Sequence, residues 1–377
     1  MSSFDLKKIV RPRMYNLQFH HCAEDNFEGD VAQDGSENAA SPTVEGLDKP
    51  TDPQQLELKA VLANYRNKTS VFKDLEPLTA DNVCLGVGSD EGIDTVIRAT
   101  CVPGKEKILI NPPTYPMYSV CANINDVEVV ECPLLIKDIS FQIDIEKILS
   151  ILGGDPLVKL CFITSPGNPT GQKVDTHRLI KLLENWKNGL VVVDEAYIDF
   201  CGGSVAPLVT KYPNLVVLHT LSKSFGLAGI RLGATFCSVE FSRVLNAMKA
   251  PYSISRVTSE FALKAVENHN LELIEQNAKK INEEKYRLLK TLTSFPLVDK
   301  YQLGGLDANF ILLRIRGGDN ELARRIYYHL ATISGVVVRF RGDELGCKGC
   351  LKITVGTREE NDKLITEFKR AVDDFMQ

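Results

Sequence analysis

The sequence predicts an α/β protein with a mostly parallel central sheet in a large domain and a smaller second α/β domain. Three observations indicate this fold. Short, mostly apolar runs recur between residues 83 and 237, and segments with a helical spacing of apolar residues separate most of them. Runs that are apolar throughout indicate strands buried on both faces, as in a parallel sheet covered by helices. From about residue 271 the pattern changes to a shorter series of strands and helices.

The chain is expected to begin with an arm over residues 1–53, because residues 25–53 mix acidic residues with Gly, Ser and Pro and show no apolar periodicity. The large domain is expected over residues 54–270. It begins with a helix from Gln54, where the apolar residues follow a helical spacing. Its strands are expected at residues 83–88, 107–110, 127–132, 158–164, 190–194, 215–220 and 233–237.

The small domain is expected over residues 271–377, together with part of the arm. Helical segments at residues 255–269 and 271–292 lead into it. Ligands of such sheets bind beyond the carboxyl ends of the strands, so the polar residues that follow each strand are the candidates for a site. The other predicted elements of this domain are strands at residues 309–315, 336–340 and 351–356, a helix from Glu321 and a terminal helix.

The composition favours a cytoplasmic protein that acts on small molecules. The net charge of −5 leaves no excess of Lys and Arg for nucleic acid or for an anionic membrane surface. No apolar run is long enough to cross a membrane, and the first residues lack the apolar stretch of a secretion signal. We therefore expect neither nucleic acid nor a membrane as a partner.

The ten cysteines are scattered through the chain, often within apolar stretches, as expected of reduced and buried thiols. Only Cys347 and Cys350 form a C-x-x-C motif. A zinc or redox site would need a second ligand pair or a thioredoxin-like setting, which the sequence does not show. We interpret the motif as a turn with free thiols and expect no metal.

Asp194 is the first polar residue after four apolar ones, and Tyr197 follows three positions later. Such an acid can face a ligand, can cap the next helix as a structural residue, or can belong to the acidic strand of a P-loop nucleoside triphosphatase. The last interpretation lacks its partner, because the chain has no G-x-x-x-x-G-K-S/T motif and Gly104 and Lys105 are followed by Glu. The first two interpretations stay open.

Ser222, Lys223 and Arg231 follow the strand predicted at residues 215–220, in a segment punctuated by glycine. Partial burial of Lys223 would disfavour its ammonium form and prepare the amine to attack a carbonyl group. Ser222 and Arg231 could hold a phosphate dianion beside it. The alternative is a solvated loop lysine without a catalytic role.

Three further turns carry candidate residues. Asn168 lies in a turn with two prolines and two glycines, where its amide could face a ligand or simply favour the turn. Ser89 and Asp90 open a helix after a glycine, so their backbone N–H groups could bind an anion, although the glycines could merely form a tight turn. Tyr115 could stack on a planar ring or pack within its proline-rich loop.

Together these residues supply a phosphate site, a nucleophilic amine, an acid, phenol and amide donors and an aromatic ring. Pyridoxal 5'-phosphate requires this set of groups. The acid would keep the pyridine nitrogen protonated, so that the ring can take up electrons. The lysine would hold the aldehyde and move a proton. The sequence therefore predicts this cofactor.

Eight blocks occur in a characteristic order: VCLGVGSDEG, INPPTYPMYSV, TSPGNPTG, VVVDEAYIDF, TLSKSFGLAGIRLG, GGLDANF, VVVRFRG and LKITVGTREE. With them, nearly the whole chain resembles the fold-type I aminotransferases that depend on pyridoxal phosphate, and among them the histidinol-phosphate aminotransferases of fungi. The resemblance implies a homodimer. It also implies amino transfer from L-histidinol phosphate to 2-oxoglutarate, giving imidazole acetol phosphate and glutamate in histidine biosynthesis.

The resemblance also implies a role for each matching residue. Lys223 would hold the cofactor aldehyde, and Asp194 would meet the pyridine nitrogen. Tyr197, with Asn168, would meet the ring oxygen. The other implied contacts are the cofactor phosphate for Ser222, Arg231 and the backbone amides of Ser89 and Asp90, the ring face for Tyr115, and the substrate for Arg339, Lys352 and Asn38.

The arm departs from the family pattern. Residues 35–38 read G-S-E-N where the family shows A-N-E-N, so Ser36 replaces an asparagine and Asn38 is retained. Pro50 stands where a tyrosine would contact the partner's cofactor phosphate, and His20 or its neighbour stands where a further tyrosine is expected.

Lys352 stands where many family members outside fungi have arginine, so a point charge replaces a bidentate group. These departures concern substrate choice rather than the chemical step. Three alternatives on the same scaffold stay open: another small-molecule aminotransferase, a phospho-amino-acid decarboxylase, and a non-catalytic protein that binds pyridoxal phosphate.

Overall fold

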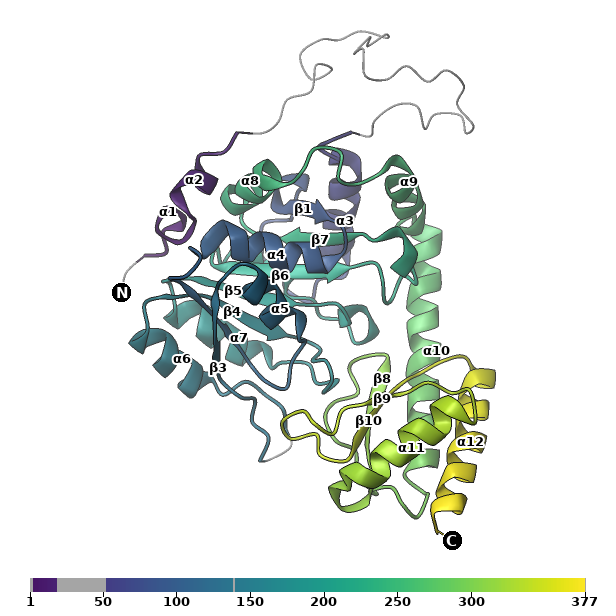
Figure 1. Cartoon of the computed structure of the whole chain (residues 1–377). Coiled ribbons are helices and arrows are strands. Elements are labelled where there is room, and N and C mark those ends of the chain that lie inside the picture. Colours follow the sequence, from purple (N-terminus) through teal and green to yellow (C-terminus); the bar gives the residue numbers. More distant parts are fainter. Residues whose placement is uncertain (1–2, 19–51, 138–139, 377) are drawn as a thin grey trace, which may run out of the picture.

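The computed structural model describes residues 3–18, 52–137 and 140–376 (Figure 1). Its main feature is a seven-stranded sheet with the strand order β1-β7-β6-β5-β4-β2-β3. Only β7 runs antiparallel to its neighbours, which confirms the predicted, mostly parallel sheet. The strands are β1 (Val83–Gly86), β2 (Lys107–Ile110), β3 (Glu128–Glu131), β4 (Val158–Thr164), β5 (Leu190–Asp194), β6 (Leu215–Thr220) and β7 (Gly233–Phe236).

Helices cover both faces of this sheet. Successive side chains of a strand point to opposite faces, and here the side chains on both faces are apolar and need to be buried. In β5, Val191 and Val193 belong to one apolar cluster, whereas Leu190 and Val192 belong to another. This double burial is the reason for the wholly apolar runs in the sequence. The first cluster includes residues of α3 (Leu56–Lys68), α6 (Ile145–Gly154) and α7 (Thr176–Asn185), and the second includes residues of α4 (Ser89–Thr100), α5 (Met117–Ile124) and α8 (Val239–Met248).

A second, three-stranded antiparallel sheet has the order β8-β10-β9. The expected strand at residues 336–340 is wrong in its extent, because only β9 (Arg339–Phe340) pairs, and Val337 is 71% exposed. Helices α10, α11 and α12 share an apolar cluster with this sheet. The elements are α9 (Arg256–Ala265), α10 (Asn268–Leu292), β8 (Phe310–Arg314), α11 (Asn320–Thr332), β10 (Cys350–Thr354) and α12 (Arg358–Met376).

The long helix α10 runs beside both sheets (Figure 1). Its residue Ala278 packs near Tyr197, whereas Leu288 and Leu292 lie in the core of the three-stranded sheet. The proposed boundary between a large domain of residues 54–270 and a small domain of residues 271–377 falls near the start of this helix, and the division stays a proposal.

The described part of the arm packs on the large sheet. Helices α1 (Leu6–Ile9) and α2 (Pro12–Tyr15) are short, and Leu6 and Ile9 belong to the same apolar cluster as α4 and α8. The backbone N–H of Arg11 donates to the carbonyl of Ala99, at the end of α4, over 2.8 Å. Whether other arm residues join the small domain stays a prediction, because residues 19–51 lie outside the described part of the chain.

Backbone hydrogen bonds tie the loop before β8 to the turn after β4. The N–H of Gly305 donates to the carbonyl of Thr170, and the N–H of Asp307 to that of Gly171, each over 2.9 Å. The small sheet is therefore held against the carboxyl ends of the parallel strands, where a ligand crevice is expected.

The close approach of β7 to the turn between β1 and α4 generates a testable prediction. A Cβ at Gly233 would lie 2.4 Å from the backbone carbonyl carbon of Gly88 and 2.4 Å from the nitrogen of Ser89. We expect Gly233→Ala to lower the free energy of unfolding by about 1–3 kcal/mol, because one of the two segments must move.

The matched control is Gly229→Ala, since a Cβ at Gly229 meets nothing within 4 Å. Its effect should stay within about 1 kcal/mol. Urea denaturation of both variants measures the difference, and equal losses would contradict the assigned close approach.

Candidate active site

A cavity of about 250 Å³ lies where the carboxyl ends of β4, β5 and β6 meet the start of α4 and strand β10. Among the residues that the structure describes, it brings together every predicted site residue except Arg339. It also contains four residues that the sequence did not single out. The lining residues are Ser89, Asp90, Tyr115, Thr164, Asn168, Asp194, Ala196, Tyr197, Thr220, Ser222, Lys223, Ala228, Arg231 and Lys352.

Asp194, the last residue of β5, is buried in the floor of this cavity. Its Oδ2 accepts a hydrogen bond from the Tyr118 hydroxyl at 2.8 Å, and its Oδ1 accepts one from the Ala196 N–H at 3.1 Å. Burial raises the pKa of Asp194 to about 6, although both donors lower it. A buried carboxylate without a cation in contact favours a cationic group beside it.

The start of α4 lies beside the segment after β6, at one end of the cavity. Helix α4 follows Gly88, which has φ 78° and offers no side-chain cap, so the first N–H groups of the helix face the cavity uncapped. Arg231 donates from Nη1 to the Ser222 hydroxyl at 3.2 Å, and its Nη2 lies 3.7 Å from Oδ2 of Asp90. A hydroxyl, a guanidinium and free N–H groups together suit a phosphate dianion.

Tyr197, Tyr115 and Asn168 lie around the middle of the cavity. Tyr197 is buried, and its ring packs edge-on against Phe310 at 5.2 Å. Burial, followed by the charge of Asp194, raises the pKa of Tyr197 to about 12, so the phenol keeps its proton. The Tyr115 hydroxyl donates to Oδ1 of Asp90 at 3.1 Å, which fixes its ring at the cavity wall.

The structure corrects the expected burial of Lys223. This residue is exposed, because it lies on the turn after β6, between the cavity described above and a wider one of about 870 Å³ beside α10. Its Nζ lies 5.8 Å from the centre of the Tyr197 ring. The amine is therefore accessible from the cavity.

Lys352 enters the cavity from β10, on the small sheet. Its Nζ donates to Oδ1 of Asn168 at 2.9 Å and lies 4.3 Å from the centre of the Phe310 ring. Burial, followed by the nearby charges of Arg341 and Lys223, lowers the pKa of Lys352 to about 8. Arg339 is paired with Lys352 across β9 and β10 but is exposed and does not line the cavity.

Some site residues escaped the sequence analysis. Thr164 and Thr220 end β4 and β6, so the rule that selected Asp194 at the end of β5 would have found them. Tyr118 lies one helical turn beyond Tyr115 and is wholly buried. Only the structure shows that its hydroxyl reaches Asp194. Asn38 and the arm positions Ser36, Pro50 and His20 lie outside the described residues.

The C-x-x-C motif is remote from this chemistry. Cys347 and Cys350 are buried and free in the turn that leads into β10. A contact with Cys350, together with burial, raises the pKa of Cys347, so the thiol is protonated and unreactive. Both cysteines are free thiols, as the sequence analysis expected.

The residues present fit pyridoxal phosphate. The uncapped start of α4 with Ser222 and Arg231 suits the phosphate, and the buried Asp194 suits the ring nitrogen in its cationic form. The amine of Lys223 lines the same cavity. The fit depends on the combination of these groups rather than on any single residue.

Comparison with known proteins gives a consistent result. The family described as aminotransferase class I and II matches residues 31–368. The histidinol-phosphate aminotransferase of Saccharomyces cerevisiae is 63% identical, over 98% of this chain and 98% of its own length.

Solved structures share the fold. The histidinol-phosphate aminotransferase of Sinorhizobium meliloti in complex with pyridoxal-5'-phosphate has a TM-score of 0.75 at 21% identity, covering 87% of this chain and 83% of that one. The L-threonine-O-3-phosphate decarboxylase of Porphyromonas gingivalis has a TM-score of 0.67 at 16% identity, covering 88% and 91%. The fold is therefore common to an aminotransferase and a decarboxylase.

The buried charge of Asp194 generates a prediction for the cofactor-free protein. Its pKa rises from 3.8 to about 6 on folding, so the folded state binds the proton more tightly and loses stability as the pH rises from about 4 to about 6. Above about pH 6 the free-energy cost of burying the charged carboxylate no longer changes with pH. We expect Asp194→Asn to raise the free energy of unfolding at pH 8 by about 1–3 kcal/mol.

The same substitution should weaken cofactor binding, because the amide cannot balance a cationic ring. Denaturation at pH 8 and at pH 3 measures the first effect, and it should nearly vanish at pH 3, where the acid is largely protonated in both states. An equal change in the free energy of unfolding at both pH values would contradict the assigned burial of the charge.

Proposed function

The chain belongs to the class I and II aminotransferases, and we propose that it transfers the amino group of L-histidinol phosphate to 2-oxoglutarate in histidine biosynthesis. The products would be imidazole acetol phosphate and glutamate. The observation that carries this proposal is the 63% identity with the yeast histidinol-phosphate aminotransferase over 98% of both chains. The described cavity supports it, because it combines an amine, a buried acid and two cationic ends.

Pyridoxal phosphate, when bound, supplies an aldehyde that reacts with amines and a ring that takes up electrons from the substrate carbon. Lys223 would hold the aldehyde through Nζ. Once the donor amine has replaced it, the freed Nζ would take the proton from the substrate carbon. The exposed position of Lys223 on its turn supports this role, because the amine would be free to approach this carbon.

Other residues of the chain would hold charges in place during this transfer. Asp194 would keep the ring nitrogen protonated, and the protonated phenol of Tyr197 would donate to the ring oxygen together with the amide of Asn168. Ser222, Arg231 and the first N–H groups of α4 would bind the cofactor phosphate. Tyr115 would lie against the ring.

The anionic end of the substrate would bind at Lys352. This residue reaches the cavity from the small sheet and lies near Arg341 and Arg339, which add positive charge. An anion placed there would stabilise the charged ammonium form of Lys352, which burial disfavours. Both substrates carry an anionic end, so one site can serve the two halves of the reaction in turn.

An absorbance experiment tests the proposal. Histidinol phosphate should bleach the visible band of the protein loaded with pyridoxal phosphate, and 2-oxoglutarate should restore it. Lys223→Ala should abolish the cycle, with a rate loss of about 10³-fold or more, because the group that moves the proton is gone.

Competing donors separate the alternatives. Aromatic amino acids should react at least tenfold more slowly than histidinol phosphate, and threonine phosphate should release no carbon dioxide. Turnover of either at a higher rate would point to another aminotransferase or to a decarboxylase. A coloured protein that no donor bleaches would indicate a non-catalytic binding protein.

The pKa of Lys352 generates a second prediction for this reaction. Because that pKa is about 8, the ammonium group loses its proton as the pH rises above about 8. We expect the KM for histidinol phosphate to rise above that pH by up to about tenfold per pH unit. In Lys352→Arg the rise should disappear, because a guanidinium stays charged.

Steady-state kinetics from pH 7 to pH 9.5 compare the two proteins. The ionisation of the substrate affects both alike, so only their difference is interpreted. Parallel KM profiles would show that Lys352 does not bind the anionic end.

We also propose a cytoplasmic homodimer, as the family resemblance implies. In residues 3–18, 52–137 and 140–376, no helix has the length and apolar character needed to cross a membrane. Partner-dependent contacts of the arm belong to this proposal.

A further inference from the structure

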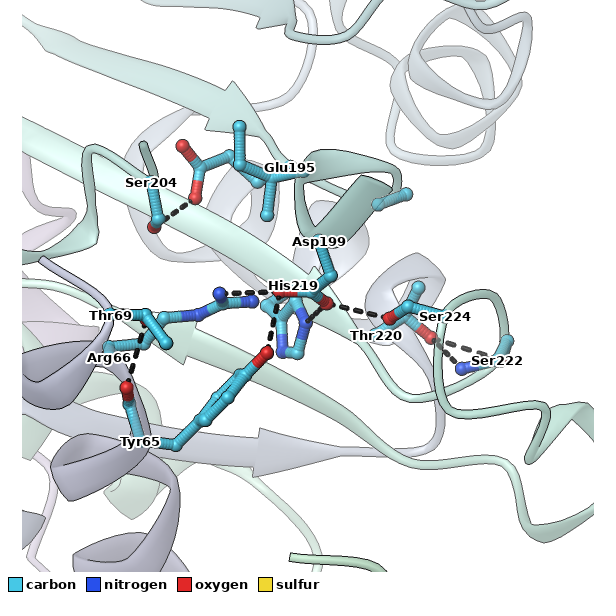
Figure 2. A network of polar contacts seen from close by, with 12 residues as sticks. Tyr65, Arg66, Thr69, Glu195, Asp199, Ser204, His219, Thr220, Ser222 and Ser224 are labelled. Atoms are coloured by element: carbon cyan, nitrogen blue, oxygen red, sulfur yellow. Dashed lines mark hydrogen bonds and ion pairs between the residues drawn. The ribbon is translucent and has the colours of Figure 1, made fainter. Parts of the chain in front are cut away.

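A second buried carboxylate, Asp199, lies in the same short segment as Asp194 and Tyr197 but takes no part in the steps above. It belongs to the 3-10 turn η3 (Ile198–Phe200), and only 5% of its side chain is exposed. Figure 2 shows it at the centre of a network of polar side chains. The question is what this carboxylate holds.

Each oxygen of Asp199 accepts two hydrogen bonds. Oδ1 accepts from Nη1 of Arg66 at 2.7 Å and from the hydroxyl of Tyr65 at 3.1 Å. Oδ2 accepts from Nε2 of His219 at 3.0 Å and from the hydroxyl of Ser224 at 2.7 Å (Figure 2). The donors belong to α3, to β6 and to the turn that carries Lys223, so one carboxylate joins three segments that are distant in sequence.

The charges of this network are settled by its contacts. Burial alone would raise the pKa of Asp199, but the guanidinium of Arg66 and then His219 lower it well below its usual range, so the carboxylate is ionised. Burial, with Arg66 next, lowers the pKa of His219, so the imidazole is neutral and Nε2 carries the proton that it donates. One buried ion pair, Arg66 with Asp199, therefore anchors neutral donors around it.

Lys223 lies between two anchored serines. On one side, the Ser222 hydroxyl accepts from Oγ1 of Thr220 at 3.0 Å and from Arg231 at 3.2 Å. On the other side, the Ser224 hydroxyl donates to Asp199. The next residue, Phe225, packs edge-on against the rings of Tyr65 at 5.7 Å and His219 at 6.0 Å.

We propose that Asp199 is a positioning residue for Lys223, which it fixes in place through the hydroxyl of Ser224. This inference rests on the proposed function, in which Lys223 holds the cofactor and moves the proton. Asp199 shares its segment with Asp194 and Tyr197, so the same contact fixes the lysine relative to the acid and the phenol. A misplacement of about 1 Å can cost about a hundredfold in rate, and an exposed lysine on a turn depends on such an anchor.

A purely structural role would make Asp199 a counterion for Arg66 and nothing more. A substitution of Ser224 distinguishes the two roles. Ser224→Ala removes only the link to the lysine turn and leaves the buried ion pair in place. Asp199→Asn is a poorer test, because it leaves the guanidinium of Arg66 buried without a counterion and can unfold the protein.

The matched control is Ser204→Ala. The Ser204 hydroxyl donates to Oε2 of Glu195 at 2.5 Å in the same buried region, and no hydrogen bond among the described residues joins it to the lysine turn (Figure 2). Both variants lose one hydroxyl-to-carboxylate hydrogen bond, and Ser204→Ala also removes the acceptor of the Ala206 N–H at 3.1 Å, so the control is the more disruptive of the two. A general softening of the region would affect both alike.

The experiment measures how fast the cofactor-free full chain captures pyridoxal phosphate at Lys223, by borohydride trapping and peptide mapping at timed intervals. We expect Ser224→Ala to slow capture by about tenfold to a hundredfold. Its kcat for amino transfer should fall by a similar factor while the KM for the donor stays within about twofold. Ser204→Ala should match the wild type in both, and Ser224→Thr, which keeps a hydroxyl, should recover most of the loss.

Wild-type capture and kcat in Ser224→Ala would overturn the proposal, and so would equal losses in Ser224→Ala and Ser204→Ala. Capture is measured without any donor. If histidinol phosphate proved not to be a substrate, the proposed function would fail while the capture rates still tested Asp199.

Discussion

The parallel direction of β4, β5 and β6 is the constraint on which the site depends. Parallel neighbours end at the same edge of a sheet, so Thr164, Asp194 and Thr220, which lie far apart in the sequence, are brought to one line. The turns beyond these strands then carry Asn168, Tyr197 and Lys223 to the same cavity. Because the strands themselves are buried on both faces, this edge is where the large sheet can present polar groups to a ligand without breaking its own core.

Two buried carboxylates in one segment, Asp194 and Asp199, have different pKa values because they receive different hydrogen-bond donors. Asp194 and Asp199 are both buried, and burial pushes the pKa of each upward. Asp194 accepts hydrogen bonds from a phenol and one N–H, which do not offset the effect of burial on its pKa. Asp199 accepts hydrogen bonds from a guanidinium and three further donors, and these do offset it. Asp194 is thus left able to pair with a cation from outside the chain. Asp199 has already met its cation within the fold and can serve only as an anchor.

The strand ends could be predicted because burial leaves a trace in the sequence. Mostly apolar runs located β4, β5 and β6, and the polar residues at and after their ends located most of the cavity wall. The exposure of Lys223 could not be predicted, since a turn between two cavities has no characteristic composition. The Asp199 network could not be predicted from the sequence either. Arg66 and Asp199 are 133 positions apart, and their pairing depends on how α3 packs on the sheet. Strand β9 was overestimated because Val336 and Val337 have the composition of a strand but extend beyond the paired region.

The hydrogen bond from Lys352 to Asn168 gives the second sheet its part in the site. It joins a residue of β10 to the turn after β4, so the ammonium group of Lys352 enters the cavity only while the small sheet is docked on the large one. Docking also explains why the charge of Lys352 is disfavoured, since the same contacts that bring it in remove water from its ammonium group. In the proposed reaction, the anionic end of the substrate would offset the hydration that this ammonium group has lost. Asn168 would contact both the cofactor ring and Lys352, and would therefore link the substrate end of the cavity to the ring at its centre.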